Sequence, residues 1–213
     1  MTRQVTVIDY GVGNLFSVRR ALEKCDAQVL VTDDPEKIMN SARIVLPGVG
    51  AFADGMRGLV DRGLDMVIRE YAKSGRPLLG ICLGMQMLGT ISEEFGVHDG
   101  LAIISGRVAE IPRTGSDGIA HKIPHIGWAS LEMPRMRNGW KGTILEAIEP
   151  GDSVYLVHSF AITPTDDADR LADCTYNGRI ISAAIQSGNV IGCQFHPEKS
   201  GSVGLKILDQ FLT

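Results

Sequence analysis

Cysteine is scarce in this chain, and its placement excludes two common structural uses. The four cysteines lie at positions 25, 82, 174 and 193. They form no C-x-x-C pair, so the spacing indicates neither a zinc site nor a disulfide framework. We therefore expect no metal site, and each cysteine needs its own explanation. Cys25, Cys174 and Cys193 follow a helical stretch or fall inside strand-like runs, where a free cysteine usually serves as a small buried hydrophobe.

A block of basic residues is also missing. The chain has 21 Lys and Arg against 25 Asp and Glu, a formal net charge of -4 and a pI near 5.7. The positive charges are scattered along the sequence, which gives no electrostatic footprint for nucleic acid or for an anionic membrane. We expect no nucleic-acid partner and no membrane partner.

Long apolar segments are absent too. The longest apolar tract, residues 77–91, is interrupted by Gly80, Gly84, Gln86 and Gly89. It falls short of the ~18 uninterrupted apolar residues that are typical of a membrane span. The N-terminal sequence MTRQVTVIDYGVG enters a strand-like run early, without the apolar core of a signal peptide. These features predict a cytoplasmic protein.

The sequence does contain a regular alternation of strand-like and helix-like segments. Its 213 residues are 44% hydrophobic, enough to fill one core, and we expect a single domain over residues 1–213. Apolar runs at 5–9, 28–32, 43–46 and 77–81 predict buried strands, and the segments between them have helical spacing, including one amphipathic stripe over 54–73. This alternation predicts an α/β fold with a mostly parallel central sheet flanked by helices.

The C-terminal half has a different pattern, with short strands joined by turn residues. Runs at 171–176, 179–186 and 190–195 are separated by Asn177-Gly178 and by Ser187-Gly188-Asn189. Asn-Gly between two strand-like runs is a strong hairpin signal. We expect an antiparallel strand meander here, followed by a last helix over 203–211.

One cysteine differs from the others, Cys82 in the segment GICLGMQ at 80–86. A strand that turns sharply into a helix needs small residues beside the corner, and Gly80 and Gly84 supply them. A helix starting at Leu83 would place the thiol beside unpaired amide groups, which favour the nucleophilic thiolate and could hold an oxyanion. The alternative is a tightly packed turn in which Cys82 is a small buried side chain and nothing more.

A nucleophilic thiolate needs a base, and the base needs an orienting group. The segment QFHPEKS at 194–200 offers His196 at a strand end, with Glu198 two residues later. On extended backbone both side chains point to the same side, so Glu198 could orient one imidazole nitrogen while the other faces the cysteine. The histidines at 98, 121, 125 and 158 lack this combination. A capped or surface histidine is the alternative for His196.

Three segments together resemble the class I glutamine amidotransferases. They are the loop PGVGAF at 47–52, the elbow GICLGMQ at 80–86 and the segment QFHPEKS at 194–200. The resemblance implies a Cys-His-Glu triad of Cys82, His196 and Glu198. In such a triad the thiolate attacks the side-chain amide of glutamine, and the products are glutamate and ammonia.

The same resemblance implies the surroundings of the triad. Backbone N–H groups of Val49 and Leu83 would form the oxyanion hole, and a peptide flip in this loop is cheap beside glycine. No cofactor is implied. For Glu94 an alternative remains, because Glu93-Glu94 could equally be a solvated pair at a helix end. The residues implied to hold glutamine are Gly48, Gly50, Gln86, Glu94, His158, Ser159 and Phe160.

Further segments resemble one branch of that family: IDYGVGNLFSV at 8–18, PHIGW at 124–128 and YLVHSF at 155–160. In that branch the glutaminase is one subunit of a heterodimer. Its partner, a (β/α)8-barrel synthase, uses the ammonia to close an imidazole ring in histidine biosynthesis. The implied contacts to the barrel are Asn14, Trp128, Tyr155 and Lys199, although a buried core role is the usual one for a Trp or a Tyr.

Three positions depart from the branch and leave its assignment open. Ile126 and Ala129 stand where methionine and asparagine are usual, and Phe160 stands where tyrosine is frequent. A related glutaminase could feed a different synthase, for example one that aminates a sugar precursor for surface polysaccharide. Two further hypotheses are a non-catalytic glutamine-binding module, against which the intact triad argues, and a stand-alone thiol hydrolase, against which the implied barrel contacts argue.

Overall fold

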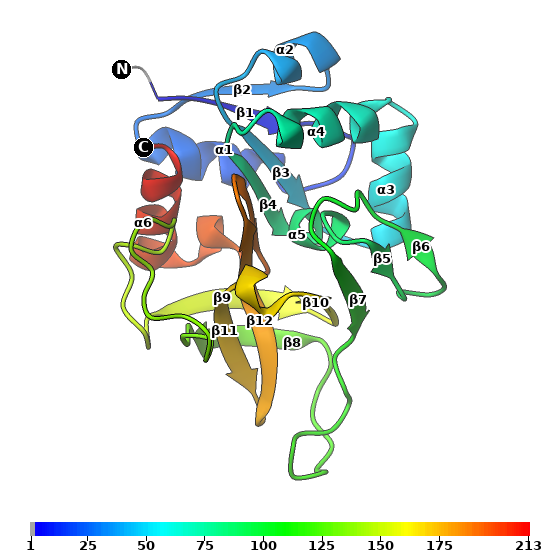
Figure 1. Cartoon of the computed structure of the whole chain (residues 1–213), viewed down its shortest axis with the longest axis vertical. Helices are drawn as coiled ribbons and strands as arrows, with labels where there is room; N and C mark the ends of the chain where they lie inside the picture. Colours follow the sequence, from blue (N-terminus) through cyan, green and yellow to red (C-terminus); the bar gives the residue numbers. More distant parts are fainter. Residues whose placement is uncertain (1–2) are drawn as a thin grey trace.

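A seven-stranded sheet forms the centre of the computed structural model, which describes residues 3–213 (Figure 1). Its strand order is β11-β12-β13-β4-β3-β1-β2. From β13 to β2 neighbouring strands are parallel, whereas β12 runs antiparallel to both of its neighbours, β11 and β13. The strands are β1 (Gln4–Ile8), β2 (Gln28–Thr32), β3 (Ile44–Gly48), β4 (Leu78–Cys82), β11 (Arg170–Tyr176), β12 (Arg179–Ser187) and β13 (Val190–Cys193).

Helices cover both faces of this sheet and bury a separate core on each. On one face lie α1 (Leu15–Lys24) and α6 (Gly201–Phe211), which pack side by side (Figure 1). On the other lie α2 (Pro35–Met39), α3 (Phe52–Val60), α4 (Leu64–Lys73) and α5 (Leu83–Met87). Because side chains alternate along a strand, β3 gives Val45 to the first core and Ile44 and Leu46 to the second. The predicted α/β fold with a mostly parallel sheet is confirmed.

The amphipathic stripe predicted over 54–73 is divided between two helices, a break that the apolar spacing did not indicate. α3 ends at Val60, and Gly63 before α4 has a φ of +65°. Glycine adopts this left-handed conformation without a steric cost, and it ends a regular helix. Leu59 and Leu64 on either side of the break still face the same core. The burial pattern was therefore readable from periodicity, while the change of direction was not.

The antiparallel meander predicted in the C-terminal half is confirmed. β11 and β12 pair up to Tyr176 and Arg179, and the two turn residues, Asn177 and Gly178, both have positive φ. Positive φ at both central positions is what a two-residue hairpin turn requires. The last strand ends at Cys193 rather than at residue 195, and the last helix begins at Gly201 rather than at residue 203.

Smaller sheets extend from the lower end of the central sheet (Figure 1). One contains β10, β7, β5 and β6, and another pairs β8 with β9. Of the described residues, none belongs to a helix long and apolar enough to cross a membrane. The remaining elements are β5 (Ile91–Ser92), β6 (His98–Asp99), β7 (Gly106–Glu110), β8 (His125–Ser130), β9 (Ser153–His158), β10 (Phe160–Pro164) and the short 3-10 helices η1 (Asp167–Asp169) and η2 (Pro197–Lys199).

Candidate active site

Cys82 occupies a sharp corner between β4 and α5. Its φ of 54° and ψ of -109° lie outside the helical and strand regions. A side chain with a Cβ is strained in such a conformation, and strain of this kind is concentrated at functional sites. Cys82 is 7% exposed and lines a cavity, so its side chain is buried at the wall of a pocket rather than projecting into open solvent.

The glycines beside this corner are needed for their small size, as predicted. Neither Gly80 nor Gly84 has a positive φ, since Cys82 itself takes the strained conformation. A Cβ on Gly84 would lie 1.9 Å from the carbonyl oxygen of Leu46, and one on Gly80 would lie 2.8 Å from the backbone of Gly84. The prediction that the corner needs small residues is therefore confirmed, but crowding against neighbouring backbone is the reason, not a positive φ at either glycine. The two glycines let the corner pack directly against β3.

His196 and Glu198 form a buried pair next to the corner. Nδ1 of His196 donates a hydrogen bond to Oε1 of Glu198 at 2.9 Å, and the two side chains are only 2% and 1% exposed. Backbone N–H of His196 is held by the carbonyl of Tyr155 in β9. The backbone through Glu198 is the 3-10 turn η2, so the expected extended path is wrong. The tight turn brings the carboxylate back to the imidazole instead.

The other imidazole nitrogen is available for chemistry. Nε2 of His196 is buried without a hydrogen-bond partner among residues 3–213, and His196 lines the same cavity as Cys82. Burial lowers the pKa of His196, but its interactions with the Cys82 thiol and the Glu198 carboxylate together outweigh burial and raise the pKa to about 9. Since Glu198 occupies Nδ1, Nε2 is the nitrogen that can exchange a proton with the thiol or with a bound molecule.

Most of the residues predicted for the site line one cavity of about 310 Å³. Glu198 lies behind His196, outside the lining. Gly48 is also outside it, because its α-carbon faces the hydroxyl of Tyr10 and the side chain of Leu83. Pro124 and Val157 line the cavity without having been predicted. The predicted residues that do line it are Val49, Gly50, Cys82, Leu83, Gln86, Glu94, His158, Ser159, Phe160 and His196.

The loop after β3 is crowded at its first glycine and has open space at its second. Gly48 is the last residue of β3, paired with Cys82, and has no room for a side chain. Gly50 has a φ of +101°, and a Cβ there would meet no described atom within 4 Å. Val49 between them is 37% exposed. The open space that a peptide flip would need is therefore found at Gly50 and not at Gly48.

Glu94 is not part of a solvated helix end. It follows the short strand β5, and its Oε2 accepts a hydrogen bond of 2.5 Å from backbone N–H of Phe52, the first residue of α3. Within the described chain that helix has no side-chain cap from its N-cap residue, Ala51. Glu94 thus caps α3 from a distant segment and places a carboxylate at the wall of the cavity.

His158 is a neutral residue that lines the cavity, and it does not compete with His196 as the base. Its Nδ1–H donates to the carbonyl oxygen of Phe160 at 2.9 Å, so its Nε2 accepts from Nδ1–H of His125 at 3.2 Å. Burial lowers the pKa of His158 to about 4. Burial also lowers the pKa of His125, whose ring stacks on Tyr176 with the centroids 4.0 Å apart.

Gln194 joins this site, and sequence reasoning assigned it no role. Its Nε2 donates to Sγ of Cys82 at 3.8 Å, and its Oε1 accepts from Nε2 of Gln86 at 3.0 Å. The sequence feature that could have indicated a role is a polar glutamine at the end of an otherwise apolar strand, in the segment QFHPEKS. Its significance depends on β13 lying beside β4, a long-range pairing that the local pattern does not reveal.

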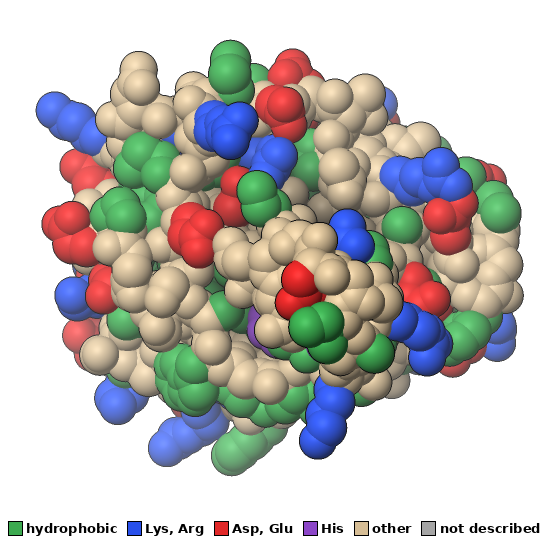
Figure 2. Space-filling view, turned by 90° about the horizontal axis from the view of Figure 1, so that it is seen from below, with side chains coloured by type: hydrophobic (Ala, Val, Ile, Leu, Met, Phe, Trp, Pro, Cys, Tyr) green, Lys and Arg blue, Asp and Glu red, His purple; other side chains and the backbone are tan. Residues whose placement is uncertain are grey.

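The residues predicted to contact a barrel partner do not line the cavity. Trp128 of β8 is 59% exposed and pairs across the sheet with Tyr155 of β9, their ring centroids 6.0 Å apart. Lys199 is exposed. Asn14 is half-buried, and its side chain accepts a hydrogen bond of 3.4 Å from backbone N–H of Ser17, which caps α1. On the face shown in Figure 2, lysine and arginine side chains are dispersed among other side chains rather than gathered into one patch.

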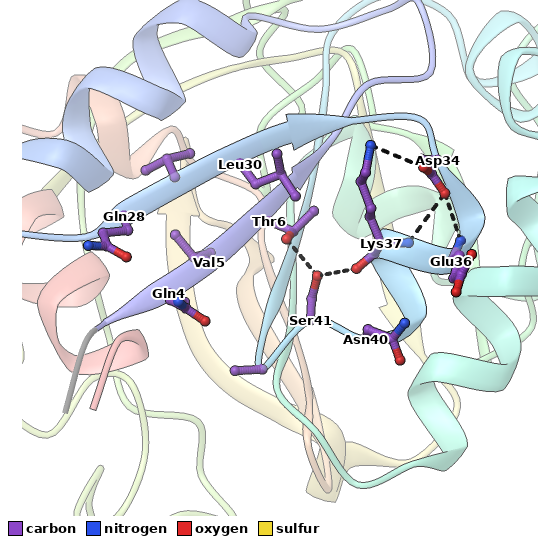
Figure 3. Close-up of a pocket in the computed structure, with 12 residues that line it drawn as sticks. Gln4, Val5, Thr6, Gln28, Leu30, Asp34, Glu36, Lys37, Asn40 and Ser41 are labelled. Atoms are coloured by element: carbon purple, nitrogen blue, oxygen red, sulfur yellow. Dashed lines mark hydrogen bonds and ion pairs between the residues drawn. The ribbon is translucent and has the colours of Figure 1, made fainter.

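A groove of about 630 Å³ lies elsewhere, at the β1–β2 edge of the central sheet (Figure 3). Its polar groups bond to one another: Thr6 Oγ1 lies 2.6 Å from Oγ of Ser41, and Nζ of Lys37 lies 3.2 Å from Asp34. Its described lining contains no cysteine or histidine. Within residues 3–213, no group of three or more His, Cys, Asp or Glu side chains is placed to hold a metal ion. The cavity at Cys82 is therefore the candidate active site.

The chain belongs to the glutamine amidotransferase class-I family, whose sequence pattern matches residues 6–213. It is an enzyme of the kind that the segments around Cys82 and His196 predicted. Two solved structures support the fold. A structure described as a glutamine amidotransferase has a TM-score of 0.71, 14% identity and coverage of 97% of this chain and 98% of its own. A chain of the PurLQS structure from Thermotoga maritima has a TM-score of 0.67, 21% identity and coverage of 100% and 98%.

Relatives with much higher identity belong to one branch of the family. Imidazole glycerol phosphate synthase subunit HisH 1 of Legionella pneumophila (strain Lens) is 53% identical over 208 residues, which cover 98% of this chain and 98% of the relative. The HisH subunit of Syntrophotalea carbinolica is 45% identical over 208 residues, with coverage of 97% and 98%. The HisH subunit of Geobacillus sp. (strain WCH70) is 44% identical over 207 residues, with coverage of 97% and 95%. The predicted resemblance to the histidine-biosynthesis branch is confirmed, and a different synthase is not favoured.

Proposed function

We propose that this chain is the glutaminase subunit of an imidazole glycerol phosphate synthase, and that it supplies ammonia to a (β/α)8-barrel cyclase subunit in histidine biosynthesis. The observation that carries the chemistry is the meeting of Cys82 and His196 in one cavity, with Glu198 bonded behind the imidazole. The names of relatives at 44–53% identity support the pathway. A single domain and a cytoplasmic location stay predictions.

The reaction uses the triad in two halves. Sγ of Cys82, as the thiolate, attacks the carboxamide carbon of glutamine, and the C–N bond breaks as Nε2 of His196 gives its proton to the departing nitrogen. Ammonia leaves and a thioester remains. Water then attacks the thioester carbon while His196 takes a proton from it, and the C–S bond breaks to release glutamate. Glu198 keeps Nδ1 protonated and the ring in place throughout.

The remaining cavity residues have supporting roles in this proposal. Backbone N–H groups of Val49 and Leu83 stabilise the oxyanion of each tetrahedral intermediate. The open space beside Gly50 leaves room for a peptide flip that completes the hole when the partner and its ligand are bound. Glutamine is held by Gln86, by Glu94 and by the segment from His158 to Phe160, all of which line the cavity. Gly48 contributes by its close packing beneath the corner.

The partner is required by the chemistry of the product. Ammonia is mostly protonated at neutral pH, and the ammonium ion is no nucleophile, so the product must reach its acceptor without equilibrating with solvent. We place the barrel partner on Trp128 and Tyr155, with Lys199 and Asn14 at its edge. The backbone carbonyl of Tyr155 accepts a hydrogen bond from the backbone N–H of His196, so this surface directly contacts the triad segment.

A Cys82→Ala variant tests the proposal when it is mixed with a histidine-pathway cyclase subunit. The proposal predicts that glutamine-dependent formation of imidazole glycerol phosphate is lost while synthesis with added ammonia continues. A glutamine-binding module would keep its effect on the partner in this variant. Retention of glutamine-dependent synthesis by Cys82→Ala would therefore overturn the proposal.

A further inference from the structure

We propose that Gln194 is a positioning residue for the nucleophile: its side-chain amide donates a hydrogen bond to Sγ of Cys82 and stabilises the thiolate in the cavity. The inference rests on the proposed glutaminase function, because it names an additional group for the same site. Gln194 is completely buried, and its amide lies one residue beyond β13. Since Cys193 pairs with Ile81 in the parallel neighbour β4, the next residue along each strand brings Gln194 beside Cys82.

The orientation of the Gln194 amide follows from its neighbours. The backbone carbonyl of Phe160 can only accept, so the atom of Gln86 that lies 2.9 Å from it must be the nitrogen, Nε2. The second hydrogen of that nitrogen points to Gln194 at 3.0 Å, so the facing atom of Gln194 must be its oxygen. The nitrogen of Gln194 is thereby turned toward Sγ of Cys82, 3.8 Å away.

The hydrogen bonds that fix this orientation end at a backbone carbonyl that is itself held in place. The same carbonyl of Phe160 also accepts from Nδ1–H of His158, whose Nε2 accepts in turn from His125. Both acceptor positions of the carbonyl are then in use, and each partner is bound to another buried group. A flip of the Gln194 amide would place two nitrogens face to face at Gln86 and leave the oxygen against the thiolate. The network therefore holds the donor toward sulfur.

The thiolate needs such a donor because the helix beside it is short. The sequence predicted that a helix starting at Leu83 would favour the thiolate, but α5 has only five residues and adds little macrodipole. Nε2 of His196 lines the same cavity but makes no hydrogen bond to a described residue, whereas Gln194 directs a donor at the sulfur from the adjacent strand. A hydrogen bond from an amide to an anionic acceptor is charge-assisted, so it favours the thiolate over the thiol.

Alkylation of Cys82 by iodoacetamide across a pH series tests this role, with the Cys82 peptide followed by mass spectrometry. Gln194→Glu replaces the donor by an anionic acceptor, and we expect the pH midpoint of alkylation to rise by about one unit or more. Gln194→Met keeps the size but removes the donor, and we expect a smaller rise. Gln28→Glu, in the distant groove of Figure 3, is the matched control and should leave the midpoint unchanged.

Glutaminase measurements with the cyclase subunit complete the test. We expect kcat to fall about tenfold to a hundredfold in Gln194→Met, with a smaller change in KM. If Gln194→Glu does not fold, Gln194→Met alone decides. A folded Gln194→Met whose alkylation midpoint matches the wild type would overturn the inference. Absence of glutaminase activity in the wild-type complex would instead overturn the proposed function, and the alkylation profile distinguishes the two failures.

Discussion

Nδ1 of His196 lies 2.9 Å from Oε1 of Glu198, and both side chains are almost completely withdrawn from solvent. The carboxylate is two residues from the imidazole in sequence and reaches it only because η2 turns tightly. A buried carboxylate stabilises the imidazolium and fixes the ring, so that Nε2 can face the cavity. The proposed glutaminase chemistry depends strongly on this pair, because without an oriented acid the departing nitrogen of glutamine has no proton source.

A Glu198→Gln variant tests the electrostatic part of that relationship. A neutral amide stabilises the imidazolium less than a carboxylate does, so the pKa of His196 should fall from about 9. We expect glutamine-dependent turnover to fall about 10²- to 10⁴-fold. NMR titration of His196 and steady-state kinetics with the cyclase subunit measure the two effects. Glu70→Gln, which removes half of an exposed ion pair on α4, is the control, and an unchanged His196 titration in Glu198→Gln would contradict the account.

The buried neutral His158 predicts a pH dependence of stability. Its folded-state pKa of about 4 is below its ordinary value of 6.5, so the unfolded chain binds the extra proton first as pH falls. The free energy of unfolding should be at its full value above pH 6.5 and should decrease as pH falls toward 4, by on the order of 3 kcal/mol for this group.

Urea unfolding of the wild type and of His158→Asn at several pH values measures this effect. Asparagine keeps a side-chain N–H near the Phe160 carbonyl but cannot gain the proton. The difference in unfolding free energy between the two proteins should shrink between pH 6.5 and pH 4. Parallel pH profiles for the two proteins would show that His158 is not the group responsible.

The close approach at Gly84 predicts a large loss of stability on adding one methyl group. In Gly84→Ala the new Cβ would meet the Leu46 carbonyl oxygen at 1.9 Å, which forces α5 away from β3 and costs about 3 kcal/mol or more. Gly63→Ala is a useful comparison, because its backbone is left-handed but no described atom lies within 4 Å of the added Cβ. We expect a cost of about 1 kcal/mol there. Equal unfolding free energies for the two variants would refute the packing role of Gly84.

Trp128 predicts a loss of partner binding without a loss of stability. Its side chain is 59% exposed, so Trp128→Ala should change the unfolding free energy little. An aromatic residue at the centre of an interface commonly contributes about 2 kcal/mol or more to the binding free energy. The expected loss of binding is therefore about a thirtyfold rise in Kd. Calorimetric titration with the cyclase subunit measures it. Met66→Ala, 60% exposed on α4 at the other end of the molecule, should bind normally. Normal binding by Trp128→Ala would place the interface elsewhere.

The features readable from the sequence are those set by local pattern. The strands of the parallel sheet, the Asn177-Gly178 hairpin and the corner at Cys82 each follow from apolar runs and turn residues within a few positions. The helix break at Gly63 was missed because the apolar spacing continues through it. The backbone conformation between His196 and Glu198 was also missed, because the short local pattern there fits either a 3-10 turn or an extended strand.

Features that depend on distant segments could not be read from local pattern. Gly84 is needed because Leu46 lies against it, and Glu94 is useful because it caps a helix that begins at Phe52. The role proposed for Gln194 depends on β13 lying beside β4 and on the carbonyl of Phe160 in a third strand. The roles of the site residues stay predictions, while their meeting in one cavity is a property of the fold.

The most direct measurement is glutamate release from glutamine by the purified chain, first alone, then with the histidine-pathway cyclase subunit, and then with the nucleotide ligand of that cyclase added. The account predicts slow release by the isolated chain and a steep rise in the complete mixture, because we propose that the partner binds at Trp128 and Tyr155 and that the oxyanion hole is completed only in the complex. A Cys82→Ala control should release none in any mixture. Release that is unaffected by the cyclase, from a chain whose Cys82 still alkylates normally, would contradict the account and assign this glutaminase to another synthase.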